Sequence, residues 1–385
     1  MNIQLRSVLF AVLVIQLVSS SSCKKENNES KSDIIESLMI STQAQLKSPG
    51  WMAAMYSPDE TIVLTGGLAS IEENIAMKRD QQLRIGSVTK TFVATLVLIL
   101  VDEGKLSLNE KLSNYYPHFP KSDEITIRHL LMHTSGIVTW DENEDIRNSI
   151  YDGTGNWTID KLIDWASEQT LLSDPGMQFH YSNIGYFLLG KIIEHVTETS
   201  VAEALRDKIT VPLGLKNTFM AEVPHPVSEV IHGYDESSGA IEDITNFPPS
   251  DEINFHLAWT AGGLFSSLDD MSNWARALAI GSLLSDSLHQ QQMPVLNPPS
   301  ASLPYWKGYG MGVNQTDVWI GHTGAVSGFI CNMNHYPEKN VTVISFFNKF
   351  SAFSLEHNTS DLNLVSNNYL ELLLIACPET LQPEN

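Results

Sequence analysis

The 385-residue chain has few basic residues and few cysteines. It contains 23 Lys and Arg against 45 Asp and Glu, a formal net charge of -22, and no run of basic residues. Nucleic-acid binding depends on a basic surface, so this balance argues against DNA and RNA as partners. The composition, 43% hydrophobic and 18% charged, is that of a globular protein. Its length allows two or three compact units or one large two-lobed enzyme.

Three cysteines are too few for a disulfide framework. Cys331 and Cys377 either form one bridge, as export would allow, or stay as two buried free thiols. Neither lies in a catalytic pattern with a nearby His, so we assign no nucleophile to them.

Only the start of the chain carries a long apolar run. Residues 8–18 are apolar except for Gln16, follow Arg6, and lead into four serines and Cys23. A spanning helix needs about 20 apolar residues, whereas this order of charge, apolar run and small residues is typical of a secretory signal. We expect residues 1–22 to be a signal peptide and the protein to be exported to the cell envelope or secreted.

Cys23 directly follows small residues at the end of this signal, an arrangement that resembles a bacterial lipoprotein signal. By that resemblance the Cys23 thiol is lipidated and anchors the protein to the envelope membrane, and residues 23–31 form a polar tether. The alternative is ordinary secretion with a free Cys23.

Strand patterns come from both ends of the mature chain, and helical patterns mostly from its middle. Before residue 105 we expect a helix at 32–46 with Ser32 or Asp33 as its N-cap, a hairpin of strands 51–56 and 61–64, and a buried helix over 87–101. In the middle, helical spacing covers 126–133, 184–196 and 269–278, and near the end we expect strands 318–320, 329–336 and 341–347 and a helix 362–377.

These patterns predict an α/β (α+β) fold, in which an antiparallel β-sheet flanked by helices packs against a mainly helical lobe. The sheet lobe comprises about 32–104 and 300–377, and the helical lobe about 105–299, within a single domain 32–385. No repeat of fixed period is present.

Ser87 and Lys90 occupy the start of the predicted buried helix. A Ser at the first helical turn lies near unpaired backbone N–H groups and the positive end of the helix dipole, which favour a developing alkoxide. Lys90 lies on the same helical face, and in a dry pocket its neutral amine can accept the serine proton. Coincidence explains the spacing equally well, because Ser21 and Lys24 match it by accident.

Two further motifs favour catalysis. Tyr181-Ser182-Asn183 precedes a predicted helix, and its phenol can relay a proton while its amide holds a carbonyl or the lysine. His322-Thr323-Gly324 follows a predicted strand. Singly, the first is explained as a capped helix start and the second as a strand-to-turn transition. Their joint occurrence with Ser87 favours a catalytic constellation.

The chain resembles the serine penicillin-recognising superfamily, which contains class C β-lactamases, serine DD-carboxypeptidases and some esterases. The resemblance rests on Ser87-Val88-Thr89-Lys90, Tyr181-Ser182-Asn183 and His322-Thr323-Gly324 in the family's order. Segments 98–106, 127–136 and 261–264 support it, and it covers about residues 35–375. A His opening the third motif is more similar to the carboxypeptidase and esterase branches than to a typical β-lactamase.

The resemblance implies a role for each matching residue. Ser87 is the acylated nucleophile, and Lys90 and Tyr181 transfer its hydroxyl proton. Asn183 binds the amide of the substrate's side chain, His322 and Thr323 contact the group on the leaving side, and the main-chain N–H groups of Ser87 and of Ala325, the residue after Gly324, form the oxyanion hole. Removing one such donor costs roughly 3 kcal/mol of transition-state stabilisation. No cofactor or metal is implied.

One departure from the family's pattern concerns the substrate. Similar carboxypeptidases place an Arg after a Gly-x-Gly pair to receive the peptide's terminal carboxylate, but here Gly310-Met311-Gly312 is followed by Val313-Asn314. Asn314 can donate one hydrogen bond but lacks the bidentate fork of Arg. The sequence leaves open whether the substrate is a small D-alanyl peptide, a lactam or an ester, with the D-alanyl-D-alanine carboxypeptidase favoured.

Other patterns have simpler explanations. His129 and His133 are four apart but lack the Glu of a metalloprotease motif, so we expect no zinc site there. Asp269-Asp270 are expected at a helix start after Ser266-Ser267, and Tyr305, Trp306 and Tyr309 line either a cleft or the core. A non-enzymatic lipoprotein that binds penicillin or peptidoglycan has no reason to keep the whole catalytic set.

Overall fold

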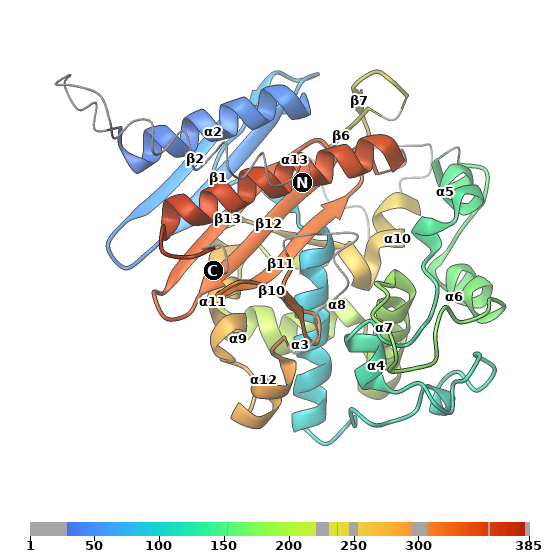
Figure 1. The fold of residues 1–385 in the computed structure, drawn as a ribbon. Coiled ribbons are helices and arrows are strands. Elements are labelled where there is room, and N and C mark those ends of the chain that lie inside the picture. The colour runs from blue at the N-terminus through green and yellow to red at the C-terminus, as the bar shows by residue number, and fades with distance from the viewer. Residues whose placement is uncertain are drawn as a thin grey trace, which may run out of the picture.

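The structure is a computed structural model that describes residues 29–151, 153–220, 231–236, 238–245, 253–294, 306–352 and 355–381 (Figure 1). The expected signal peptide, Cys23 and most of the tether lie outside these residues, as does Tyr305. In the described part of the chain, no helix has both the length and the apolar character needed to cross a bilayer.

A single large antiparallel sheet joins the two ends of the chain. Its eight strands lie in the order β3-β2-β1-β13-β12-β11-β10-β9, so the N-terminal hairpin pairs with the last strand. The strands are β1 (Gly50–Tyr56), β2 (Thr61–Ser70), β3 (Ile75–Ala76), β9 (Gly308–Tyr309), β10 (Asn314–Thr316), β11 (Trp319–Val326), β12 (Phe329–Tyr336) and β13 (Val341–Phe347). The predicted hairpin and the strands at 329–336 and 341–347 are confirmed. The strand expected at 318–320 instead runs from Trp319 to Val326, so His322-Thr323-Gly324 lies within β11 and does not follow the strand, because pairing with β12 continues through these residues.

Alternate residues of β1 face two different cores. Trp51, Ala53 and Met55 pack under α2 (Lys31–Leu46) and α13 (Leu355–Ala376), which lie side by side over one face of the sheet (Figure 1). Met52 and Ala54 belong to the larger core on the other face, which α11 (Leu268–Ile280) covers. This period of two is what a sheet buried on both faces requires.

The two cores also separate the cysteines. Cys331 belongs to the larger core and Cys377 to the core under α13, and both are buried free thiols. The open question of a bridge is thus answered by geometry, because the sheet lies between the two sulfur atoms.

The helical part packs around α3 (Thr89–Asp102), whose side chains from Thr89 to Leu98 are all buried. This helix contacts α7, α8 and α10. The helices and turns of this part are η1 (Gly86–Val88), η2 (Leu112–Asn114), α4 (Ile127–Leu131), η3 (Trp140–Glu142), α5 (Glu144–Tyr151), α6 (Ile159–Ser167), α7 (Asn183–Thr197), α8 (Val201–Leu205), η4 (Arg206–Thr210), α9 (Val211–Leu213), α10 (Ile253–Gly262) and α12 (Asp286–Gln292).

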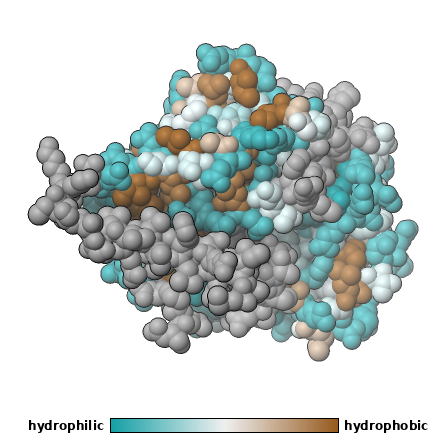
Figure 2. All heavy atoms as spheres, turned by 45° about the horizontal axis from the view of Figure 1, so that its top comes forward, coloured by the Kyte–Doolittle hydropathy of each residue, from teal (hydrophilic) through white to brown (hydrophobic). Residues whose placement is uncertain are grey.

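Short strands complete the structure. A three-stranded sheet has the order β4-β8-β5, and β6 pairs with β7. These strands are β4 (Leu83–Arg84), β5 (Phe219–Met220), β6 (Tyr234–Asp235), β7 (Glu242–Asp243) and β8 (Leu264–Ser266). On the face seen in Figure 2, hydrophobic residues lie in separate patches among hydrophilic ones, as is usual for the surface of a globular protein.

Three local expectations need correction. The N-cap of α2 is Ser30, not Ser32 or Asp33, because the Ser30 hydroxyl accepts a hydrogen bond from the Asp33 N–H and the Asp33 carboxylate accepts one from the Ser30 N–H. The helix expected at 126–133 ends at Leu131, and His133 has a left-handed φ of 54°, so it does not share a helix face with His129. The last helix begins at Leu355 rather than at residue 362.

Candidate active site

Ser87 lies in η1, the turn that leads into α3. Gly86 before it has a φ of 49°, a left-handed value that glycine adopts without strain. Its position is also crowded, since a Cβ on Gly86 would lie 2.7 Å from the main-chain nitrogen of Ala325. The turn therefore sets Ser87, which is half-buried, directly beside β11.

Lys90 is fully buried one turn further along α3. Its Nζ donates to Ser87 Oγ (3.1 Å), to Asn183 Oδ1 (2.8 Å) and to the carbonyl oxygen of Ala261 (2.6 Å). Burial lowers the pKa of the Lys90 amine to about 7, although the Asp141 carboxylate raises it in part. At neutral pH, a large share of the amine is thus unprotonated and able to accept the Ser87 proton.

Tyr181 places its ring over the lysine, with Lys90 Nζ 4.8 Å from the ring centroid. Burial raises the pKa of the Tyr181 phenol above its ordinary value, while the neighbouring Ser87 hydroxyl lowers it in part. Although the Ser87 hydroxyl is nearby, the Tyr181 hydroxyl has no partner of standard hydrogen-bond geometry among the described residues. It is a neutral phenol beside Ser87, able to pass a proton but not to act as the first base in a reaction there.

Asn183 is the first residue of α7 and connects Lys90 to a carboxylate. Its Oδ1 accepts from Lys90, and its Nδ2 donates to Asp141 Oδ1 (3.1 Å). The Thr139 hydroxyl donates to the same Asp141 oxygen, and the Asn183 N–H donates to the Thr139 hydroxyl (3.2 Å). These bonds fix which end of the Asn183 amide faces the lysine.

The edge of β11 lies against the turn that carries Ser87. β10 pairs with β11 only as far as Gly321, so among the described residues no strand pairs with Thr323 to Ala325 on that edge. A Cβ on Gly324 would lie 1.9 Å from the Ile85 carbonyl oxygen, so only glycine lets β11 approach the Ser87 turn this closely. The main-chain nitrogen of Ala325 thereby lies close to the Gly86-Ser87 turn, where the sequence-based expectation of an oxyanion hole needs a donor.

His322 and Thr323 lie on β11 and are both buried. The His322 Nδ1 is 2.6 Å from the Thr323 carbonyl oxygen, and its Nε2 is 3.1 Å from the Tyr309 hydroxyl. Burial lowers the pKa of His322 to about 3, so the ring is neutral, donates from Nδ1 and accepts at Nε2. Both ring nitrogens of His322 therefore have partners within the protein, the Thr323 carbonyl oxygen and the Tyr309 hydroxyl.

Asn314 is not placed to receive a carboxylate. Its side chain is 1% exposed, its amide oxygen accepts from Trp306 Nε1 (2.6 Å), and its amide nitrogen donates to the Gly321 carbonyl oxygen (3.0 Å). Trp306 and Tyr309 form a small aromatic cluster packed against Phe179 and Tyr181. Trp306 and Tyr309 are therefore buried residues that pack against Tyr181, and they are not part of the exposed surface.

Two residues at the site were not foreseen as functional. Asp141 lies in η3, and no motif marks it in the sequence. His133 accepts from the Ser182 N–H at Nδ1 (3.1 Å) and stacks on Tyr181, with ring centroids 4.1 Å apart. His133 falls within segment 127–136, which supports the resemblance, but it was otherwise weighed only as a metal partner of His129.

Comparison with known proteins identifies the family. A family model described as Beta-lactamase matches residues 35–365. The chain belongs to the Beta-lactamase family. Similar proteins include Protein flp of Staphylococcus aureus (strain MW2), 27% identical, and the D-aminopeptidase of Gluconobacter oxydans (strain 621H), also 27% identical. The matches cover 77% and 84% of this chain, and 59% and 60% of those relatives.

The putative penicillin-binding protein PbpX of Bacillus subtilis (strain 168) is 28% identical over 75% of this chain and 66% of its own length. The chain thus spans 59% to 66% of the length of these curated relatives.

Solved structures confirm the predicted fold of this Beta-lactamase family member. The D-amino acid amidase from Ochrobactrum anthropi SV3 has a TM-score of 0.75 and 25% identity, and the match covers 89% of this chain and 98% of that one. The octameric penicillin-binding protein homologue from Pyrococcus abyssi has a TM-score of 0.73 and 25% identity, over 91% and 79%. The chain is therefore a member of the β-lactamase and penicillin-binding superfamily of serine hydrolases.

Proposed function

We propose that this protein is a serine amidohydrolase that forms an acyl-enzyme at Ser87 on D-amino acid amides or on peptides with a free N-terminal D-residue. The observation that carries the proposal is the Asp141 carboxylate beside Asn183, next to the nucleophile and its base. A substrate's α-ammonium group is a suitable partner for a half-buried carboxylate. The names of a similar protein, D-aminopeptidase, and of a similar structure, D-amino acid amidase, agree with this chemistry.

The proposed reaction begins with Lys90, because its lowered pKa leaves part of the amine unprotonated and able to accept a proton. The neutral Lys90 amine takes the Ser87 proton as Oγ attacks the amide carbon, and the N–H groups of Ser87 and Ala325 stabilise the resulting oxyanion. Tyr181 and Lys90 then return the proton to the leaving amine. A water molecule, activated by the same pair, hydrolyses the ester at Ser87 and releases the D-amino acid.

The charge around Asn183 separates this proposal from a D-alanyl-D-alanine carboxypeptidase. A carboxypeptidase needs a cation for the terminal carboxylate, but among the described residues Lys90 is the one cationic side chain that hydrogen-bonds to Ser87 or Asn183. The Arg147 guanidinium donates to the main-chain oxygen of Asp141 (2.8 Å) and not to the Asp141 carboxylate. Asn314 is engaged elsewhere. The carboxypeptidase, lactamase and esterase activities thus become outcomes of the test below.

The test compares D-alanine p-nitroanilide with its N-acetyl form and with an N-acetylated D-alanyl-D-alanine peptide. We expect the free-ammonium substrate to have at least a tenfold higher kcat/KM than the acetylated one. Asp141→Asn should remove that preference while leaving the acetylated substrate nearly unchanged. Asp145→Asn, an exposed carboxylate on nearby α5, is the matched control and should keep the preference. Faster release of D-alanine from the acetylated peptide would instead support the carboxypeptidase.

We further propose that the protein acts at the cell envelope, held there through a lipid on Cys23. The support is the order of Arg6, apolar residues 8–18, small residues and Cys23. The full chain should enter the detergent phase on partitioning after expression in a bacterium that processes lipoproteins, and Cys23→Ala should stay in the aqueous phase. Equal partitioning of the two would refute the anchor.

A further inference from the structure

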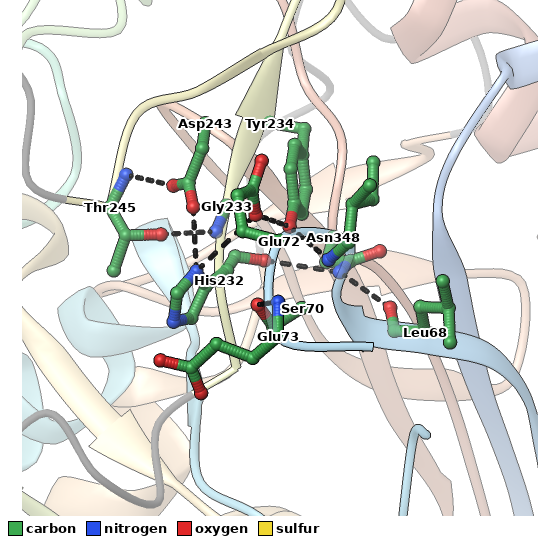
Figure 3. Close-up of polar contacts among 11 residues, drawn as sticks. Leu68, Ser70, Glu72, Glu73, His232, Gly233, Tyr234, Asp243, Thr245 and Asn348 are labelled. Carbon is green, nitrogen blue, oxygen red and sulfur yellow. Dashed lines mark hydrogen bonds and ion pairs between the residues drawn. The ribbon is translucent and has the colours of Figure 1, made fainter. Parts of the chain in front are cut away.

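Three metal-ligating side chains meet at the end of the sheet, where three separate segments of the chain converge (Figure 3). Glu72 comes from the turn after β2, His232 from the residues before β6, and Asp243 from β7. We refer to this group as the His232 site. It is a different site from that of Ser87, whose hydrogen-bonded neighbours include none of these residues.

The ligand atoms of the His232 site face one another. His232 Nδ1 is 2.6 Å from Asp243 Oδ2 and 3.9 Å from Glu72 Oε2, and all three atoms lie within 4.8 Å of each other. A tetrahedral ion with ligands at about 2.1 Å holds its ligand atoms roughly 3.4 Å apart. The observed spacings lie on either side of that value, so small side-chain rotations suffice to form a coordination shell.

Neighbouring groups already orient both carboxylates. The Tyr234 hydroxyl donates to Glu72 Oε2 (2.9 Å), and the Thr245 N–H donates to Asp243 Oδ1 (2.8 Å), which leaves Asp243 Oδ2 toward His232. In Figure 3 the Glu72 and Asp243 carboxylates both point at the imidazole, whereas the Glu73 carboxylate points away. Outer hydrogen bonds of this kind fix the ligands of metal centres.

The main chain of His232 is also fixed. Its N–H donates to the Ala69 carbonyl oxygen (2.9 Å), and its own carbonyl oxygen accepts from Asn348 Nδ2 (3.0 Å). The same Asn348 nitrogen donates to Leu68 (3.1 Å), so one amide joins the ends of β2 and β13 to the His232 segment. The ligand backbone therefore loses little entropy on binding an ion.

We propose that the His232 site binds a divalent transition-metal ion of the Zn²⁺ type, with Glu72, His232 and Asp243 as protein ligands and water in the remaining position. One imidazole nitrogen and two carboxylate oxygens suit Zn²⁺, whereas Ca²⁺ and Mg²⁺ prefer oxygen ligands alone. The side-chain exposures of Glu72, His232 and Asp243, 52%, 14% and 20%, leave an entry path. The ion's role is structural, since it joins the turn after β2 to the paired strands β6 and β7, which lie far from that turn in sequence.

The test is equilibrium dialysis of the chelator-treated full protein against ZnCl₂, with thermal unfolding as a second readout. We expect wild type to bind one more Zn²⁺ than His232→Ala, and Glu72→Gln to bind that ion at least tenfold more weakly. At saturation, Zn²⁺ should raise the melting temperature of wild type by roughly 3–6 °C and that of His232→Ala by less. Ser87→Ala should bind the ion as wild type does.

Two matched controls separate this site from adventitious binding. Glu73→Gln changes the neighbouring carboxylate, and His118→Ala changes an exposed histidine elsewhere, so both should bind Zn²⁺ as wild type does. Equal stoichiometry and affinity in wild type, His232→Ala and Glu72→Gln would overturn the proposal. So would equal stabilisation of wild type by millimolar Ca²⁺, because the imidazole would then have no part in the choice of ion.

Discussion

Lys90 is the residue whose chemistry depends most on its surroundings. Burial lowers the pKa of its amine to about 7, and the hydrogen bonds to Ser87 and Asn183 aim it at the nucleophile. His322 and His133 do not titrate in the same range, because burial lowers the pKa of His322 to about 3 and that of His133 well below its ordinary value. Lys90 should therefore dominate the acidic side of the pH profile.

The pH dependence of kcat/KM on a neutral ester tests this directly. Because the unprotonated amine is the active form and its pKa is lowered, activity should rise through about pH 7 and fall roughly tenfold per unit below it. Asp141→Asn should move the midpoint to lower pH, since the Asp141 carboxylate raises the Lys90 pKa. A flat profile between pH 5 and 9, or a midpoint near 10, would show that Lys90 is not the base.

Local and distant contacts differ in how far the sequence predicts them. Ser87 and Lys90 are one helical turn apart, so their contact follows from helix geometry alone. The bond from Lys90 to Asn183 joins residues 93 positions apart and was anticipated only because the motif offers an amide. Asp141 could not be predicted, because its place beside Asn183 depends on the path of an irregular loop that no periodicity describes.

The meeting of η1 with β11 is the contact between elements on which the site depends. Gly86 and Gly324 are the two positions where a side chain would push the strand away from the Ser87 turn. The proposed oxyanion hole needs this close approach, because its two donors are the N–H groups of Ser87 and Ala325.

Gly324→Ala should therefore lower kcat on a small ester by about 10²-fold, because the added Cβ would meet the Ile85 carbonyl oxygen. Gly185→Ala in α7 is the control. Its Cβ would lie 3.6 Å from the nearest atom, an ordinary contact, so activity should stay near that of wild type. Circular dichroism and thermal unfolding would show that both variants fold, and wild-type kcat in folded Gly324→Ala would contradict the account.

Elements with strong patterns were predictable, and short ones were not. β12 and β13 are runs of β-branched and aromatic residues, and their predicted bounds, 329–336 and 341–347, match the structure. β9 and β10 have two and three residues, which is too short for any alternation to show. β2 continues to Ser70 beyond the predicted Leu64, because pairing with β1 continues through Gly66 and Gly67, residues with little strand preference of their own.

At the scale of the whole molecule, a buried ion pair connects the last helix to the sheet. Lys349, just after β13, has a side chain that is 2% exposed, and its Nζ lies 3.0 Å from Asp361 Oδ2 in α13 and 3.3 Å from Glu236 Oε2. Removing Asp361 would leave the buried Lys349 ammonium with Glu236 alone, and the Glu236 carboxylate is shared with Lys47. The packing of α13 against the sheet therefore depends on the ion pair between Lys349 and Asp361.

Asp361→Asn should lower the free energy of unfolding by about 3 kcal/mol, measured by denaturant titration. Glu379→Gln is the control, because its ion pair with Lys339 is 3.7 Å long with both side chains 55% exposed. An exposed pair of that kind contributes about 0–1 kcal/mol. Equal losses in the two variants would show that Lys349 is not held by Asp361.

The most direct test of the account is the intact mass of the purified protein after exposure to a penicillin and, separately, to a small D-alanine ester, beside Ser87→Ala. If Ser87 is the nucleophile, wild type should form an acyl adduct or consume the compound, and Ser87→Ala should do neither. An adduct of the same mass on Ser87→Ala, or no adduct and no turnover of either compound by wild type, would contradict the assignment of Ser87 as the nucleophile.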